Sequence, residues 1–118
     1  MDATSFELIV SIPRDARYAD TLRDLAIHAA RYAGCRGMDA DRFGDAVANV
    51  VLACLAEGHG GHVPVVVRRS DGPVEFLIGA ERRFQAAAPR DAHITIGWTH
   101  ENGQSMCRVA RSMPKDNC

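Results

Sequence analysis

Two dipeptides in the second half of the chain, Asp71-Gly72 and Asn102-Gly103, constrain its fold more than any other feature. Alternating apolar residues flank each of them, and Asp-Gly or Asn-Gly in that setting is the strongest short-range signal for a β-hairpin. Pro64 and Pro73 indicate that the first strand of the earlier hairpin starts at the edge of its sheet and that the turn is wider than two residues, because proline cannot donate to a central ladder. The second half of the chain is therefore predicted to form two hairpins.

The first half of the chain shows a change of period. Residues 5–13, SFELIVSIP, alternate apolar and polar side chains, which is the period of a half-buried strand, and Pro13 ends it. Residues 14–34 then place apolar side chains at three- and four-residue spacing and end at a glycine, which predicts a helix. The same spacing follows Asp39 or Asp41, either of which can cap a second helix, until the glycines of EGHGG break it.

The predicted order of elements is strand, helix, helix, strand, strand, a short connector at residues 81–92, strand and strand. This order predicts an α+β fold, with a mostly antiparallel sheet of about five strands and two main helices packed on one face. A length of 118 residues suits one domain. We expect this domain to occupy residues 5–113, followed by a flexible tail at residues 114–118.

Charge and composition exclude several classes of protein. The formal net charge is -1, from 14 Lys and Arg against 15 Asp and Glu, so the chain lacks the basic footprint of a nucleic-acid-binding protein. No apolar run reaches the roughly 20 residues of a transmembrane helix, and no basic region precedes the first apolar stretch. The four cysteines form no CxxC pair and no tight framework, which disfavours a disulfide-stapled secreted fold. We expect a cytoplasmic protein without nucleic-acid or membrane partners.

Two stretches of the first half resemble a known family. FELIVSIPRDARYADTLRDLAIHAARYAG is a strand that ends in proline, followed by a helix with an early arginine, Arg23, and FGDAVANVVLACLAEG looks like a second helix. Together they resemble the anti-sigma-factor serine kinases, small members of the histidine-kinase-like ATPase superfamily. The resemblance implies the ATPase-type fold and raises the question of whether the catalytic residues are present.

In that family the second helix carries a Glu that activates a nucleophile or water and, four residues later, an Asn that holds the magnesium ion of ATP. Positions four apart share one helix face, so both side chains can reach one site. One register places Asn49 at the Glu position and Ala53 at the Asn position, where neither side chain can perform the chemistry. The other register aligns Asp45 with the Glu and Asn49 with the Asn, but it requires a deletion between the helices. We favour the first register because it keeps apolar residues in phase.

The glycine-rich elements of the family are also missing. The resemblance implies an Asp-x-Gly-x-Gly box and a mobile lid after the third strand, whereas VEFLIGA is followed only by ERRFQAAAPRDA. A phosphate cradle needs glycines that bring backbone N–H groups close to the ligand, and this segment has none. The chain is therefore predicted to lack the nucleotide lid.

The resemblance thus implies a non-catalytic regulatory protein, a pseudo-kinase that needs no cofactor and acts by protein–protein binding in bacterial signalling or transcription control. The implied partner is a sigma factor, an anti-sigma antagonist or a signalling kinase, and a homodimer is a further expectation. We expect the partner to bind the first helix and the start of the second, through Arg17, Tyr18, Arg23 and Arg31.

Two alternatives stay open. One is an ATP-dependent serine kinase that uses Asp45 and Asn49 with magnesium. The other is a metal site formed by Cys54, His59 and His62, although structural zinc usually shows two paired ligand spacings and only one is present here.

Two further side chains are given structural roles. His28 falls within the apolar phase of the first helix and is predicted to be partly buried. Trp98 alternates with Ile94 and Ile96, so we expect it on the core side of its strand, with an interface role as the alternative.

Overall fold

The computed structural model describes residues 6–35, 37–56, 61–69, 72–80, 84, 93–101 and 103–112. Their secondary structure follows the predicted order of elements. The elements are β1 (Phe6–Pro13), α1 (Tyr18–Tyr32), α2 (Met38–Ala56), β2 (His62–Arg69), β3 (Val74–Gly79), β4 (Ile94–Glu101) and β5 (Gln104–Arg111). Neither helix has an apolar stretch long enough to span a membrane within these residues.

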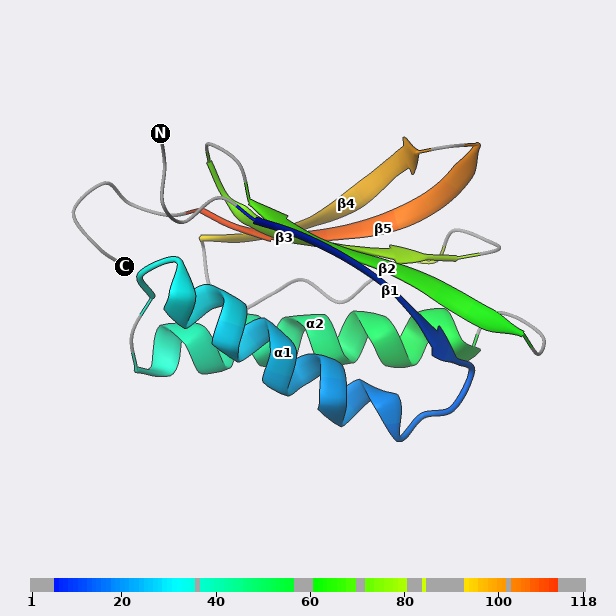
Figure 1. Cartoon of the computed structure of the whole chain (residues 1–118), viewed down its shortest axis with the longest axis horizontal. Coiled ribbons are helices and arrows are strands. Elements are labelled where there is room, and N and C mark those ends of the chain that lie inside the picture. The colour runs from blue at the N-terminus through cyan, green and yellow to red at the C-terminus, as the bar shows by residue number, and fades with distance from the viewer. Residues whose placement is uncertain are drawn as a thin grey trace.

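The five strands form one antiparallel sheet in the order β1-β2-β3-β5-β4. Figure 1 shows α1 and α2 together on one face of this sheet, and the β4–β5 hairpin rising away from the helical layer. Within the described residues, β1 forms one edge of the sheet and β4 forms the other. The predicted α+β class, with two helices on one face of an antiparallel sheet, is confirmed.

Pro64 does not mark a sheet edge, so that prediction is wrong. β2 lies between β1 and β3, and Pro64 stands opposite Ser11 of β1. The ladder to β3 begins one residue later, at Val65 opposite Ile78, so the missing N–H of Pro64 lies outside the paired residues of that ladder. Gly79 leaves room for the proline ring, because a Cβ at Gly79 would lie only 2.7 Å from Pro64 Cγ.

The two helices pack antiparallel and unusually close together. Residues near the end of α1 meet residues near the start of α2, and Gly44 of α2 lies against Ile27 of α1. A Cβ at Gly44 would lie 2.6 Å from Ile27 Cγ1 and 3.0 Å from the carbonyl oxygen of Arg23. The absence of a side chain at Gly44 is what permits this approach.

The core lies between the helices and the sheet. Phe43 of α2 meets Phe76 of β3 edge to face, with ring centroids 5.8 Å apart, and both are fully buried. Every apolar residue that set the phase of the second helix is buried, namely Phe43, Val47, Val50, Val51, Cys54 and Leu55. The C-terminal end of α2 is capped by Arg14, whose Nη1 donates to the carbonyl oxygens of Cys54 at 2.9 Å and Leu55 at 3.2 Å.

A buried arginine joins the end of β5 to the turn between the helices. Arg111 is 2% exposed, donates from Nε to the sulfur of Cys35 at 3.0 Å and lies 3.7 Å from Asp39 of α2. Cys35 is disulfide-bonded, whereas Cys54 and Cys107 are free thiols. The contacts of Arg111 therefore attach the start of α2 to the end of β5, on the helical face of the sheet.

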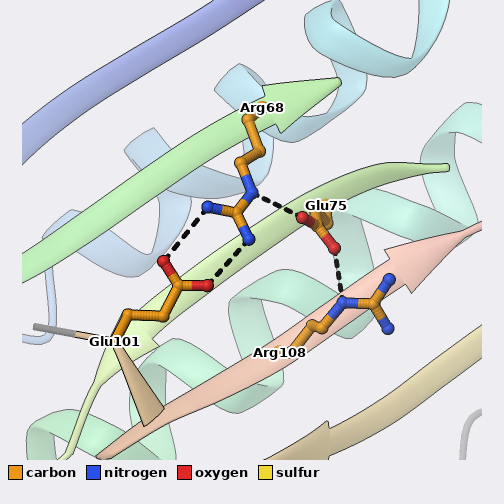
Figure 2. A network of polar contacts seen from close by, with 4 residues as sticks. All are labelled: Arg68, Glu75, Glu101 and Arg108. Atoms are coloured by element: carbon orange, nitrogen blue, oxygen red, sulfur yellow. Dashed lines mark hydrogen bonds and ion pairs between the residues drawn. The ribbon is translucent and has the colours of Figure 1, made fainter. Parts of the chain in front are cut away.

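Four charged side chains cross the opposite face of the sheet, away from the helices (Figure 2). Glu75 accepts hydrogen bonds from Nε of Arg68, at 2.6 Å, and from Nε of Arg108. Arg68 also forms a bidentate salt bridge with Glu101, in which Nη2 donates to Oε2 at 2.8 Å and Nη1 donates to Oε1 at 3.1 Å. Burial alone would raise the pKa of Glu75, but the two arginines outweigh it and hold the pKa below its ordinary value.

The contact between Arg68 and Glu101 requires a strongly curved sheet. Thr95 is the β4 residue in line with Arg68 across the sheet, and Glu101 lies six residues further along, roughly 20 Å in a straight strand. Twist and curl of the β4–β5 hairpin bring Glu101 back towards β2. Leu77 and Met106 share this face and are 0% and 4% exposed, so the curled sheet shields part of a face that carries no helix.

The predicted connector at residues 81–92 lies outside the described residues apart from Phe84. The ring of Phe84 meets Trp98 edge to face, with centroids 5.0 Å apart. Trp98 is half-buried and shares its side of β4 with Ile94 and Ile96, as the alternation predicts.

Candidate partner-binding surface

An apolar groove with a volume of about 280 Å³ opens between β1 and α1. We call it the edge groove, because it runs beside a sheet edge. Its walls are Phe6, Leu8 and Val67 from the sheet and Leu25, His28, Ala29 and Tyr32 from α1.

The local sequence explains why the edge groove exists. Phe6 and Leu8 are two residues apart on β1, so both point to the side of the sheet that carries the helices. The residues from α1 recur at three- and four-residue spacing and share one face of that helix. Ala29 is too small to fill the space opposite β1, and Tyr32 meets Phe6 edge to face, at 5.6 Å between centroids.

His28 is exposed at this groove, so the prediction that it would be partly buried is wrong. It does lie in the apolar phase of α1, next to Ala29 and Leu25. That part of the α1 face lines the open edge groove, however, and no described residue covers it.

Large apolar side chains gather at the same edge. Leu8 is 44% exposed, Ile9 is 68% exposed and Tyr32 is 60% exposed. β1 carries a single charged residue, Glu7, in eight residues. Long edge strands are usually protected by charges, prolines or bulges within the strand, and Pro13 stands only at the end of β1. An apolar edge of this kind is typical of a protein-binding surface.

The first two residues of the predicted binding surface lie at the other end of α1. Arg17 precedes the helix and pairs with Asp15 at 2.7 Å, and the hydrogen bonds from Arg17 lower the pKa of Asp15. Tyr18 is half-buried and packs against the core. The edge groove lies along the second half of α1, so the structure does not bring Arg17 and Tyr18 to it.

The other two predicted arginines bridge the helices. Arg23 Nε donates to Asp45 at 2.7 Å, and Arg31 lies 3.6 Å from Asp41. These pairs cross the outer seam between α1 and α2, where exposed ion pairs contribute little to stability. Their arginines can therefore exchange an intramolecular carboxylate for one on a partner at low cost.

Asp45 and Asn49 share an exposed face of α2, as their spacing predicts. Asp45 is the carboxylate that the serine-kinase alternative needs, and here it accepts the hydrogen bond from Arg23. A nucleotide-bound magnesium ion at this face would have to compete with that guanidinium.

The residues of the predicted metal site are not seen together. Cys54 is 1% exposed, and burial raises the pKa of its thiol to about 12, so the metal-binding thiolate is strongly disfavoured. His62 is exposed at the start of β2, and His59 lies outside the described residues. No group of three or more His, Cys, Asp or Glu side chains placed to hold a metal occurs in the part of the chain that the structure describes.

No protein-family model and no curated protein sequence matches the chain. The resemblance to anti-sigma-factor serine kinases therefore stays a prediction.

Proposed function

We propose that the chain is a non-catalytic regulatory protein that acts by binding a protein partner through the edge groove. The observation that carries this proposal is the coincidence of three features: an edge strand that pairs on one side only among the described residues, an apolar groove beside it, and three large exposed apolar side chains at the same edge.

The chemistry of the edge groove favours a protein partner over a reaction. Small-molecule sites combine an apolar cavity of about 300–1,000 Å³ with a few polar groups that orient the ligand. The edge groove lies just below this range, and only two of its lining side chains carry a polar group, His28 and Tyr32. A partner side chain that enters the groove while its backbone approaches β1 would use both the cavity and the strand edge.

The resemblance suggests the kind of partner: a sigma factor, an anti-sigma antagonist or a signalling kinase, met in the cytoplasm without a bound cofactor. The two arginines that pair with aspartates between α1 and α2, Arg23 and Arg31, would then recognise acidic groups of that partner. A serine kinase using ATP and magnesium through Asp45 and Asn49 is the second candidate, and a metal-binding protein is the third.

Partner capture with a matched pair of variants tests the groove. Leu8 and Leu52 are both 44% exposed, but Leu8 lines the edge groove and Leu52 lies on α2. We expect tagged wild-type protein and Leu52→Lys to retain the same partner from a lysate of the source cells, and Leu8→Lys to lose it. Equal capture by Leu8→Lys, confirmed by titration of the purified partner, would refute the groove as the binding surface.

A calorimetric titration with ATP and ADP, with and without magnesium, separates the first two candidates. We expect no saturable heat. Magnesium-dependent binding that Asn49→Asp abolishes would overturn the non-catalytic proposal in favour of the kinase. Elemental analysis of the purified protein tests the third candidate in the same preparation.

A further inference from the structure

We infer that the edge strand β1 pairs antiparallel with β1 of a second copy of this chain, with Ile9 opposite Ile9 on the two-fold axis. This inference rests on the proposed function, because it names the first occupant of the protein-binding edge. It would make the two sheets one continuous sheet of ten strands, with an edge groove on each side of the axis.

The hydrogen bonds of β1 show which residues can pair outward. Arg14 N donates to the carbonyl of Gly61 at 3.3 Å, which makes these two opposite residues a hydrogen-bonded pair of the antiparallel ladder. Hydrogen-bonded and non-hydrogen-bonded pairs alternate, so the even-numbered residues of β1 bond to β2. The odd-numbered residues, Glu7, Ile9 and Ser11, therefore direct their N–H and C=O groups to the free edge.

Pro13 agrees with this assignment. It is also odd-numbered, and it has no N–H to offer to either side. Proline is tolerated in a sheet where its nitrogen faces an open edge. The free part of the edge is thus limited to the stretch before Pro13.

An Ile9-centred register uses that stretch completely. Glu7 would face Ser11 of the second copy, Ile9 would face its own counterpart, and Ser11 would face Glu7. A centre at Val10 would place Pro13 opposite Glu7 and lose a donor, and a centre at Glu7 would place two carboxylates face to face. The Ile9 register is therefore the one in which the three edge-directed residues satisfy each other.

The side chains of β1 also fit a second β1. Any strand added at this edge must present apolar side chains at alternate positions on the helical side, next to Phe6 and Leu8. β1 has this pattern itself, in Phe6, Leu8, Val10 and Ile12. In the Ile9 register, Val10 of the second copy would stand beside Leu8, which is 44% exposed here.

Charge does not oppose the pairing. The two Glu7 carboxylates would be four strand residues apart along the axis of the strands, roughly 13 Å. That distance exceeds the Debye length of about 8–10 Å at ordinary salt, so their repulsion is largely screened.

Opposite charges at position 9 test the register. In a hydrogen-bonded antiparallel pair the two Cα atoms are only about 5.5 Å apart. We expect the wild-type chain to dimerise in sedimentation-velocity experiments over a concentration series. Ile9→Lys and Ile9→Glu alone should each raise the dimer dissociation constant at least about tenfold, because like charges meet on the axis. An equimolar mixture of the two variants should dimerise again.

Met38→Lys is the matched control, because Met38 is also 68% exposed but lies at the start of α2. It should dimerise as wild type does, and circular dichroism should show that all variants are folded. A monomeric wild type, a dimer unaffected by both Ile9 variants, or variants that fail to recombine would each overturn the inference.

The same variants separate this inference from the proposed function. Ile9 points to the face opposite the edge groove, whereas Leu8 lines the groove. If the chain is monomeric but Leu8→Lys still abolishes partner capture, dimerisation is refuted and partner binding stands. If Ile9 controls a dimer but Leu8→Lys retains every partner that wild type retains, dimerisation stands and the groove has no role in binding another protein.

Discussion

Gly44→Ala sets two effects of opposite sign against each other at the closest contact between the helices. Alanine is a better helix former than glycine, so the substitution by itself favours α2 by about 0.8–1.0 kcal/mol. The new Cβ would, however, lie 2.6 Å from Ile27 Cγ1, 3.0 Å from Ile27 Cδ1 and 3.0 Å from the Arg23 carbonyl oxygen.

The steric effect should be the larger of the two. Ile27 is 7% exposed, so its inner carbon cannot swing into solvent, and the Arg23 carbonyl belongs to the backbone of α1. Overpacking of a core contact costs typically about 1–3 kcal/mol. The difference leaves Gly44→Ala destabilised by roughly 1 kcal/mol.

Urea denaturation followed by far-UV circular dichroism measures this difference, and a second substitution shows its origin. In an Ile27→Ala background two of the three close contacts of the new Cβ disappear, and only the Arg23 carbonyl remains. Gly44→Ala should then be neutral or stabilising, with a coupling of about 1–2 kcal/mol between the two sites. Stabilisation by Gly44→Ala in the wild-type background, or additive effects, would refute the account of close helix packing.

Three further predictions concern groups whose contacts the structure shows. The pKa of Glu75 is lowered in the folded state, so its ion pairs contribute to stability above about pH 4.5, and this contribution is lost as the pH falls through the folded-state pKa. Glu75→Gln should therefore lower the free energy of unfolding by about 1–2 kcal/mol at pH 7 and flatten the acid limb of a stability–pH curve. Arg14→Met removes the donor to the last carbonyls of α2 and should lower the free energy of unfolding by about 1–2 kcal/mol in urea titrations; no change would show that water replaces the cap. Burial raises the pKa of Cys54 to about 12 and of Cys107 to about 11, so Ellman's reagent should label both only at the rate of unfolding, and rapid labelling in native buffer would contradict their burial.

The sequence predicts local structure well where one strong pattern decides it. The strands on either side of Asn102-Gly103, β4 and β5, pair with each other as the dipeptide predicts. β2 and β3 follow the same rule, with Val65 opposite Ile78. These elements depend on neighbours in sequence, so periodicity and turn chemistry suffice.

The errors concern the positions of elements relative to one another. His28 has the spacing of a buried residue, but spacing only identifies a helix face and does not say whether another element covers it. Pro64 has the chemistry of an edge residue, but β1 pairs with β2 and occupies the edge of the sheet instead. Ser11, the β1 residue opposite Pro64, lies 53 residues earlier in the chain. Neither outcome can be read from a local window.

The candidate site shows the same division. The alternation of β1 and the apolar phase of α1 predict each wall of the edge groove separately, but the space between Leu8 and Ala29 depends on how the two elements pack. The contact of Arg68 with Glu101 was missed for a related reason, since it depends on the curl of a hairpin. The sequence does contain a signal for the contact between Arg68 and Glu75, because these two residues flank a turn at positions that pair across a hairpin.

The pairing of β1 with β2 also sets the order in which the chain can assemble. Phe6 pairs with Arg69 and Pro13 with His62, so the ladder closes a loop that contains both helices, whereas α1–α2 and β4–β5 are joined by short connections. Long loops close more slowly than short ones, since their entropy must be lost before the contacts form. We therefore expect β1 to dock last during folding, onto a sheet and a helical pair that are already formed. Until then β2 is itself an exposed edge that carries Val63, Val65 and Val67 at alternate positions, and the slowest step of folding is the one that hides this aggregation-prone edge.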